Sequence, residues 1–357
     1  MSSLLSRILY RAKLKLNDLN DSYNEYISLR GSREKAKQFW LQLRAENDVT
    51  VVDRRLLKEI KGYCKSAFGN ESYWPWLAVY AELTGEFKKG WMPDEYYRFK
   101  FLPRMNPEKF IGLSAQKTFD YKLFKDSIVE PLLFRSNGRY CMKDGRVISK
   151  AEAARLLSAL DEEIIIKPDS SHGGEGITFK QAGELRLEEL PADGDLLFQK
   201  VVKQHPELNR LYPHSINTFR VLTYMDPNGD INIKFIYLRF GQGGNRVDNS
   251  SSGGGWIFVH LNGKVEPVAY DTDGIDIGTL HPDTGIEYAE LEFPFLQKVI
   301  TLCEKTHQTF PYLRIIAWDV FIKENGEAKF IEWNANYPGF LAVEARFGPF
   351  FEEVVNA

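Results

Sequence analysis

Residues 313–334 read LRIIAWDVFIKENGEAKFIEWN, and this stretch decides the fold class. Two runs rich in β-branched and aromatic residues flank Asn325-Gly326, the preferred centre of a two-residue type I′ hairpin turn. Counting outwards from that turn places Asp319 directly opposite Glu332. The stretch therefore predicts an antiparallel hairpin that carries two opposed carboxylates.

The two carboxylates predict a metal site, because like charges directly opposite each other repel unless a cation lies between them. Asn334 follows Glu332 by two residues and is expected on the same face, with Ile331 and Trp333 on the opposite face. Flanks this apolar argue against two solvated acids, since a buried unpaired carboxylate is costly. All-oxygen ligation by Asp319, Glu332 and Asn334 suits Mg²⁺ better than a transition metal.

Outside the hairpin, the chain divides into a helical part and a strand-rich part. Up to about residue 110, apolar residues recur at every third or fourth position, as in SREKAKQFWLQLRAEN, which indicates helices. Beyond it, short β-rich runs such as NTFRVLTYMD and INIKFIYLRF alternate with Gly, Asn and Asp turns, and helical stretches separate some of them. We therefore expect an α+β protein with mostly antiparallel sheet and a mainly helical region over residues 1–110.

The composition excludes several function classes. The 357 residues include 46 basic and 49 acidic side chains, a formal net charge of -3, which lacks the basic surface that duplex nucleic acid requires. Cys64, Cys141 and Cys303 lie far apart and have the spacing of neither a zinc cage nor a disulfide framework. We expect a protein of the reducing cytoplasm without nucleic-acid partners.

The N-terminal stretch MSSLLSRILYRAKLKLNDLN mixes apolar residues with arginines and lysines. It lacks the uninterrupted apolar core and the small-residue cleavage site of a signal peptide. Elsewhere no stretch approaches the ~20 apolar residues that a membrane-spanning helix needs. We expect a soluble protein whose basic amphipathic opening docks on the protein itself, and contact with a membrane surface is the alternative.

A candidate phosphate-binding segment lies at residues 163–176. The β-branched run EIIIKP contains Lys167, and the DSSHGGEG segment that follows contains Gly173, Gly174 and Gly176. Glycines let backbone amides face anionic oxygens, and the lysine adds a point charge for phosphate. The order differs from that of a Walker loop, because the lysine precedes the glycines. A glycine-rich hairpin loop without a ligand is the alternative interpretation.

A short apolar strand, LLFQKVV, follows at residues 196–202. The backbone of Gln199, Lys200, Val201 and Val202 would offer an acceptor and a donor to the edge of an adenine. An ordinary core strand explains the same pattern equally well.

Arg220 and Arg239 lie inside hydrophobic strands, in NTFRVLT and IYLRFG. An arginine in such a place normally pairs with a carboxylate or a phosphate, so a substrate contact and an internal salt bridge are both open interpretations. The following segment, GQGGNRVDNSSSGGGW, is too rich in Gly and Ser to pack, and it is either a surface loop or a mobile lid. As a lid, it would bring Arg246, Asp248 and Asn249 to a substrate.

In chain order, these features resemble the ATP-grasp superfamily: a strand-end lysine with a Gly-rich loop, an apolar hinge strand, an Arg-bearing hairpin, and a last hairpin with Asp and Glu-x-Asn. Over roughly residues 85–350 the chain more narrowly resembles the sugar-transfer-associated ATP-grasp family, described as related to α-L-glutamate ligases. The segments that carry this resemblance are FKKGWMPDEYYRF, QHPELNRLYPHSINTFRVLT, RVDNSSSGGG and FIEWNANYPGF.

The resemblance implies an ATP-grasp fold, in which two α+β lobes clasp ATP and Mg²⁺. The small lobe, with the phosphate-covering loop, would span residues 111–200. The large lobe, with the magnesium site and the substrate loop, would span residues 201–357.

The resemblance also implies roles for single residues. Lys167 would contact the phosphates, as would Lys122, although Tyr121 stands where the family frequently has an acidic residue. Arg220 would face the transferred phosphoryl group or the substrate carboxylate, and Arg239 is a second catalytic candidate. The remaining roles are phosphate cover by Gly173, Gly174 and Gly176, adenine contact by Gln199, Lys200, Val201 and Val202, and Mg²⁺ ligation by Asp319, Glu332 and Asn334.

The implied reaction joins a carboxylate to an amine through an acyl phosphate, with amino acids or sugar acids as substrates. Association of the family with polysaccharide loci implies a role in polysaccharide biosynthesis or in peptide modification. Phosphoryl transfer asks mainly for alignment and charge neutralisation, so no covalent nucleophile is required. The alternatives are a small-molecule or sugar kinase on the same scaffold and a nucleotide-binding protein without turnover.

Overall fold

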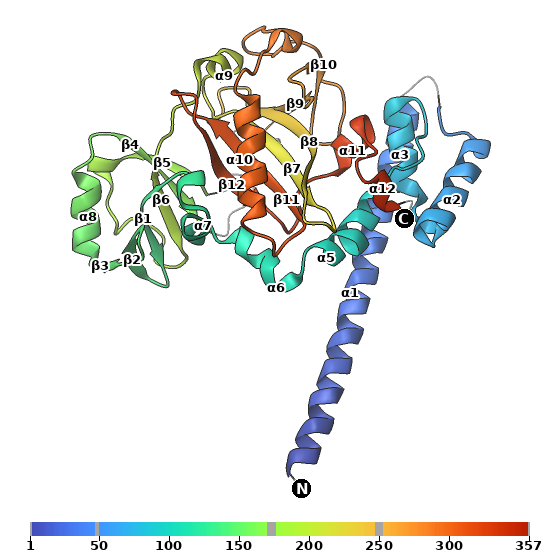
Figure 1. Ribbon diagram of the computed structural model, residues 1–357, viewed down its shortest axis with the longest axis horizontal. Helices are drawn as coiled ribbons and strands as arrows, with labels where there is room; N and C mark the ends of the chain where they lie inside the picture. The colour runs from blue at the N-terminus through green and yellow to red at the C-terminus, as the bar shows by residue number, and fades with distance from the viewer. Residues whose placement is uncertain (1, 47–49, 170–175, 247–252, 356–357) are drawn as a thin grey trace. The chain divides into compact units, whose positions relative to one another are not determined.

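The computed structural model describes residues 2–46, 50–169, 176–246 and 253–355, with side chains from residue 23 onward (Figure 1). The chain forms two compact units. The first combines Met1–Arg104 with Phe340–Ala357, and the second is Met105–Gly339. The α+β class and the antiparallel sheets predicted from the sequence are confirmed.

One antiparallel sheet of the second unit carries the hairpin quoted first. Its six strands have the order β10-β9-β8-β7-β11-β12. They are β7 (Thr218–Met225), β8 (Ile231–Phe240), β9 (Gly255–Val259), β10 (Val265–Tyr270), β11 (Ile315–Ile322) and β12 (Ala328–Asn334). Helix α10 (Leu296–Gln308) packs across one face and buries alternate β11 side chains, including Trp318 and Val320. The intervening Asp319 therefore faces the other side of the sheet.

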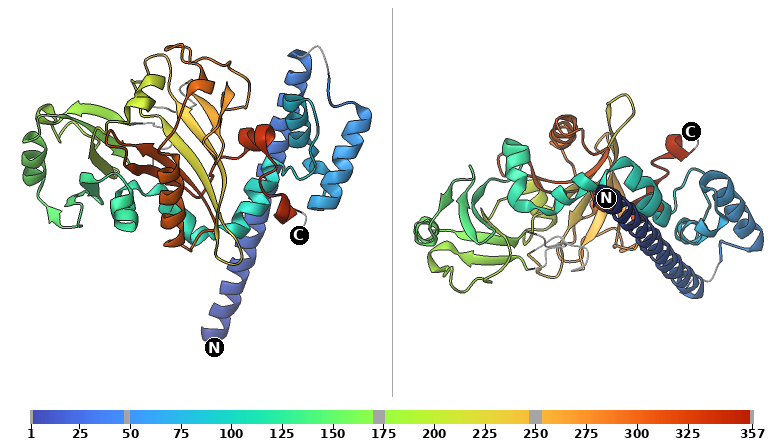
Figure 2. Two further views of the ribbon diagram at one scale, coloured as in Figure 1. Left: turned by 45° about the horizontal axis from the view of Figure 1, so that its top comes forward. Right: turned by 90° about the horizontal axis from the view of Figure 1, so that it is seen from below.

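The second antiparallel sheet of this unit has the order β3-β2-β1-β6-β4-β5. Its strands are β1 (Pro131–Ser136), β2 (Arg139–Met142), β3 (Val147–Ile148), β4 (Glu163–Pro168), β5 (Thr178–Gln181) and β6 (Leu196–Lys200). Helix α8 (Lys150–Ser158) lies beside this sheet (Figure 2). Its residues Ala153 and Leu157 belong to the hydrophobic core of the sheet. Strands β1, β2, β3 and β5 had no clear period-2 pattern in the sequence, because they are short and carry polar residues.

The second unit also contains shorter helices. They are α6 (Glu108–Ile111), α7 (Lys117–Phe124) and α9 (Pro206–Leu211). The start of α7 is tied to the end of β4, because the carboxylate of Asp169 accepts a hydrogen bond from the backbone N–H of Thr118 at 2.6 Å. This bond fixes the first turn of α7 beside the strand that carries Lys167.

The first unit is helical, as the sequence predicts. Its elements are α1 (Ser2–Glu46), α2 (Arg54–Phe68), α3 (Trp74–Thr84), α4 (Asp94–Tyr96), a π-helical turn (Tyr97–Phe101), α5 (Leu102–Met105), α11 (Leu341–Phe347) and α12 (Glu352–Val355). The aromatic residues of this part form core, with Trp76, Tyr80 and Trp91 almost completely buried. Among the described residues, no helix has both the length and the apolar character needed to cross a membrane.

The last residues of the chain belong to this helical unit, whereas the sequence analysis assigned residues 201–357 to a single lobe. Phe340 stacks on Tyr97 with 4.0 Å between ring centroids. The buried carboxylate of Glu344 accepts hydrogen bonds from the backbone N–H groups of Met92 and Phe350, at 3.0 and 3.1 Å. These contacts join two segments far apart in the sequence, so no local pattern announces them.

The β11–β12 hairpin has the predicted pairing but not the predicted turn. Asp319 pairs with Glu332, as expected. The turn, however, closes between Lys323 and Glu327, with Gly326 at a φ of 78°, and Asn325 is not among the residues with positive φ, so a type I′ turn is wrong.

A β-bulge restores the pairing. Near the turn, Val320 pairs with Phe330, and the register then shifts by one residue so that Asp319 pairs with Glu332. Ile331 is the extra residue of this bulge. The longer turn and the bulge cancel each other, which is why the simple count from the turn gave the correct partner.

Candidate active site

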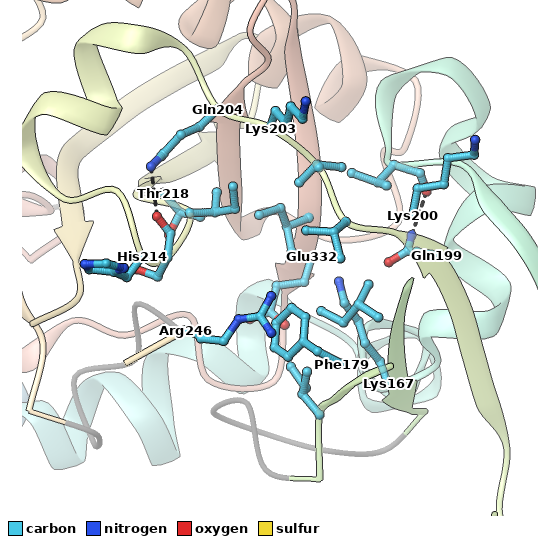
Figure 3. A pocket seen from close by; sticks show the side chains of 18 of the residues that line it. Lys167, Phe179, Gln199, Lys200, Lys203, Gln204, His214, Thr218, Arg246 and Glu332 are labelled. Atoms are coloured by element: carbon cyan, nitrogen blue, oxygen red, sulfur yellow. Dashed lines mark hydrogen bonds between the residues drawn. The ribbon is translucent and has the colours of Figure 1, made fainter. Parts of the chain in front are cut away.

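A cavity of about 430 Å³ lies between the two sheets of the second unit (Figure 3). The β1–β6 sheet contributes Lys167, Phe179 and Gln199, and the β7–β12 sheet contributes Arg239 and Glu332. The segment of residues 200–204 that links the sheets forms another wall. In Figure 3 the side chains of Lys167 and Glu332 converge on this space.

The register of the β7–β12 sheet builds a row of polar side chains across neighbouring strands. Glu332 on β12 pairs with Asp319 on β11, Asp319 pairs with Arg220 on β7, and Arg220 pairs with Tyr237 on β8. Directly paired residues project on one face. The row therefore brings two acids and a base together, and Glu332 is its member that lines the cavity.

The two carboxylates of this row have opposite electrostatic surroundings. Burial alone would raise the pKa of Asp319, but Arg220 and Arg239 outweigh burial and lower that pKa. Burial raises the pKa of Glu332, and the neighbouring Asp319 charge raises it further. The surroundings therefore favour the charged form of Asp319 and disfavour that of Glu332.

Two arginines hold Asp319. Arg220 forms a two-pronged pair with it, through Nε to Oδ1 and through Nη2 to Oδ2, the latter at 2.9 Å. Arg239 donates from Nη2 to the same Oδ2 at 3.2 Å. Arg220 also donates to the backbone oxygen of Pro338 and is not part of the cavity lining. The predicted contact of Arg220 with substrate thus finds no support here, whereas Arg239 does line the cavity.

The donor set fits Mg²⁺. A carboxylate has about four lone-pair sites, so Asp319 retains acceptor capacity beside its arginines. Asn334 lies on the same face as Glu332, and its buried Nδ2 has no hydrogen-bond partner among the described residues. Two acids and one amide give the oxygen ligands that Mg²⁺ prefers. No cluster of three or more His, Cys, Asp or Glu able to hold a metal occurs in the described part of the chain, so waters and phosphates would complete the shell.

Lys167 is the cation of the opposing sheet. It is 8% exposed, and burial lowers its pKa to about 8, against the opposing effect of the Glu332 charge. A lysine buried next to a carboxylate is placed to meet an anionic ligand. The structure thus brings Lys167 to the acids with which the sequence analysis grouped it.

The second predicted phosphate-binding lysine, Lys122, is not at the site. Its side chain is exposed and lies near Gly145, outside the cavity lining. Lys117 lines the cavity instead, and its ammonium group donates to the backbone oxygen of Asp169 at 3.2 Å. Lys117 and Lys122 are five residues apart, which in an α-helix corresponds to one full turn plus about 140°. The two lysines therefore project on different faces of α7. Lys117 is the residue that the sequence analysis missed.

The four residues predicted to contact adenine all line the cavity: Gln199, Lys200, Val201 and Val202. The Gln199 side chain donates to the backbone oxygen of Val129 at 2.9 Å. Its own Oε1 is buried and has no hydrogen-bond partner among the described residues. A buried orphan acceptor beside an apolar wall suits a ligand that carries an amino group.

Ile331 was expected on the opposite face from Glu332, and that expectation is wrong. Both residues line the cavity. The reason is the bulge, which turns the extra residue towards the site. Together with Ile165 and Val129, Ile331 supplies apolar surface for a flat ligand.

The loops that would close the site are described only in part. Gly173, Gly174, Asp248 and Asn249 lie outside the described residues. Gly176 has a φ of 71°, and a Cβ there would approach the Pro168 Cγ to 2.9 Å, so only glycine fits this position without displacement.

Arg246 spans the cavity from one sheet to the other. It extends from the β8–β9 loop, pairs with Glu163 on β4 at 2.9 Å, and lies 3.7 Å from the ring centre of Phe179 on β5. Its predicted contact with substrate stays a prediction, since its present partners are protein groups. Figure 3 shows its guanidinium group next to the Phe179 ring.

Comparison with known proteins gives a family. Residues 97–346 match the family described as sugar-transfer associated ATP-grasp. No curated protein sequence matches.

Several solved structures are distantly similar to the chain. The biotin carboxylase domain of Hydrogenobacter thermophilus 2-oxoglutarate carboxylase, solved with MgADP, has 16% identity and a TM-score of 0.37 over 64% of this chain and 41% of that chain. D-alanyl-alanine synthetase A from Vibrio cholerae has 14% identity and a TM-score of 0.38, over 68% of this chain and 63% of that chain. L-amino acid ligase from Bacillus licheniformis has 11% identity and a TM-score of 0.37, over 68% of this chain and 46% of that chain. The matched region covers less than two thirds of each of these proteins.

Proposed function

Because the chain belongs to the sugar-transfer-associated ATP-grasp family, we propose that it is an ADP-forming ligase that joins a carboxylate to an amine at the expense of ATP. The observation that carries this proposal is the cavity, which Lys117, Lys167 and Glu332 line, with the buried Asp319 paired to Glu332 behind its wall. Opposed acids and facing lysines are what a metal-bound polyphosphate requires.

The lining residues suggest how the nucleotide lies. The adenine would rest between Ile165 and Ile331, with its amino group near the orphan Oε1 of Gln199. The phosphates would extend towards Lys117 and Lys167. Asp319, Glu332 and Asn334 would hold Mg²⁺, which supplies charge neutralisation on the phosphate oxygens.

The proposed reaction has two steps. A carboxylate oxygen of the first substrate attacks the γ-phosphorus, the bond from phosphorus to the ADP oxygen breaks, and an acyl phosphate forms. The amine nitrogen of the second substrate then attacks the acyl carbon, phosphate leaves, and the nitrogen loses a proton. Arg239, at the cavity wall and against Asp319, is placed to hold the carboxylate or the transferred phosphoryl group.

An assay with Mg-ATP, hydroxylamine and pools of amino acids and sugar acids tests the proposal. We expect release of ADP together with hydroxamate, because hydroxylamine traps an acyl phosphate. Glu332→Gln serves as the blank. Release of ADP without hydroxamate would contradict the ligase and favour a kinase, and positive pools are divided until the carboxylate is identified. Amino acids and uronic acids are the first pools, in line with a role in surface polysaccharide or peptide modification.

The choice between the two α7 lysines gives a separate prediction. We expect Lys117→Ala to weaken binding of a non-hydrolysable Mg-ATP analogue by about 10- to 100-fold, because it removes one charge-assisted contact. Lys122→Ala is the matched control on the same helix and is expected to change the affinity less than about two-fold. Calorimetric titration measures both. The reverse order of effects would restore Lys122 to the site.

A further inference from the structure

A second cavity of about 510 Å³ adjoins the candidate active site and shares Val129, Lys200 and Val202 with it. Its lining contains five lysines but only two carboxylates, those of Asp126 and Glu130. Lys125, Lys143 and Lys323 directly follow α7, β2 and β11. Lys200 is the last residue of β6, and Lys329 lies in β12. The cavity is therefore a cationic site built from both sheets.

The remaining lining of this cavity is largely apolar. Pro131 and Leu132 of β1, Met142 of β2 and Phe321 of β11 supply it. A simple gap between solvated lysine side chains would not be lined by these apolar residues. An apolar wall next to a cluster of cations matches a ligand with an apolar body and an anionic group.

Most of the lysines have exchangeable partners. Lys143 pairs with Glu130, Lys200 with Glu162, and Lys323 and Lys329 with Glu327. The Lys329 side chain is only 16% exposed, but the other three pairs are exposed to water, and exposed pairs contribute little to stability. An anionic ligand can therefore displace them at small cost. Lys125 has no carboxylate partner among the described residues.

The backbone of Lys125 is held in an unusual conformation. It follows the last residue of α7 with φ 39° and ψ -112°. A positive φ is unfavourable for a residue with a side chain and is normally left to glycine, so its presence needs a reason. The conformation directs the chain so that the Lys125 side chain lines the cavity.

From this geometry we propose that the lysine-lined cavity is a second binding site, for a small organic anion with an apolar body. The phosphate, sulfonate or carboxylate group meets the lysines, with Lys125 as the main contact, and the body lies against Met142 and Phe321. The site is distinct from the ATP site, since only Val129, Lys200 and Val202 are common to both. It does not depend on the ligase proposal.

The test is direct binding of 1-naphthyl phosphate to the full chain, in the absence of nucleotide, followed by fluorescence anisotropy. We expect saturable binding below about 1 mM, and weakening by about ten-fold in Lys125→Met, since one charge-assisted contact is lost. Lys264→Met is the control, because Lys264 is another exposed lysine but does not line the cavity. The neutral analogue 1-naphthol is expected to bind much more weakly.

Lys125→Gly separates binding from folding. Glycine accepts a positive φ, so this variant is expected to melt at a higher temperature than the wild type while it binds the probe about ten-fold more weakly. Unchanged affinity in both Lys125 variants, or no binding to the wild type, would overturn the proposal. So would loss of the probe in Lys167→Met together with full retention in Lys125→Met, because the probe would then occupy only the ATP site.

Discussion

Replacing Glu332 with glutamine is expected to lower ADP release by about 10²- to 10³-fold, the usual scale for loss of one group that stabilises charge at a reaction centre, and to leave the fold intact. Glutamine keeps the shape of the side chain but removes the charge that a divalent cation requires. Burial and the Asp319 charge both raise the pKa of Glu332, so loss of the charge in the metal-free protein is not expected to destabilise the fold. Steady-state ADP release and thermal unfolding, measured on the same sample, check both parts.

Asp319→Asn is the companion variant with a different expected signature. It also removes a proposed metal ligand, but in addition it takes away the carboxylate with which the buried Arg220 is paired. Breaking a buried ion pair from one side typically costs about 3–5 kcal/mol, so we expect loss of activity together with lower stability. Glu327→Gln, an exposed acid in the same hairpin, is the control and should change stability by less than about 0.5 kcal/mol.

The comparison of the two variants distinguishes a metal site from a structural ion pair. A Glu332→Gln protein that turns over ATP at the wild-type rate would contradict the proposed Mg²⁺ site. The Asp319–Arg220 pair would then have only a structural role.

The helical unit is expected to lose stability as the pH rises from about 5 to 8. Burial raises the pKa of Glu95 to about 8 and that of Glu344 also to about 8. A carboxyl whose pKa is raised on folding stabilises the folded state below its unfolded pKa, and this contribution disappears as the pH rises through the folded value. Each group contributes a slope of about 1.4 kcal/mol per pH unit between the two values.

The charges and hydrogen bonds around Glu95 and Glu344 lower their pKa values less than burial raises them. Arg33 lies 3.6 Å from Glu95 and lowers its pKa, whereas Asp94 raises it, and burial is the larger influence. Around Glu344, the backbone N–H groups of Met92 and Phe350 lower the pKa but again less than burial raises it. Burial therefore disfavours ionisation of both acids in the folded protein.

Hydrogen exchange measures this prediction locally. After correction for intrinsic rates, amides around residues 92–101 should exchange faster relative to the β7–β12 strands as the pH rises. Glu344→Gln and Glu95→Gln should each reduce this dependence, because glutamine cannot ionise. An equal pH dependence in the wild type and in the double variant would show that other groups are responsible.

How far the sequence led can be judged from particular elements. The strands β7, β8, β11 and β12 were recognisable because each is a long run of β-branched and aromatic residues. The pairing of Asp319 with Glu332 was predicted correctly, but through a turn that is one residue too short and a bulge that was not foreseen. Local turn propensity does not determine register when a bulge farther along the strand compensates for it.

The α7 lysines show where local reasoning ends. Both Lys117 and Lys122 lie in one short helix, and the sequence offers no reason to prefer either. The choice depends on which face of α7 packs against the protein, and the bond from Thr118 to Asp169 at the end of β4 fixes that face. The same holds for Arg220, for which the sequence allowed either a ligand or an internal acid as partner. The strand order places Asp319 beside it and so identifies the acid.

The sequence by itself determined the α+β class and the helical first region, because periodicity and composition act over a few residues, while the grouping of Lys167 with Asp319, Glu332 and Asn334 was implied by the resemblance to the ATP-grasp superfamily. Tertiary structure alone decided which lysine of α7 reaches the site, which acid holds Arg220, and that the chain's last residues join the helical unit. These outcomes depend on packing between segments far apart in the chain, where burial of apolar surface and pairing of buried charges outweigh local preference.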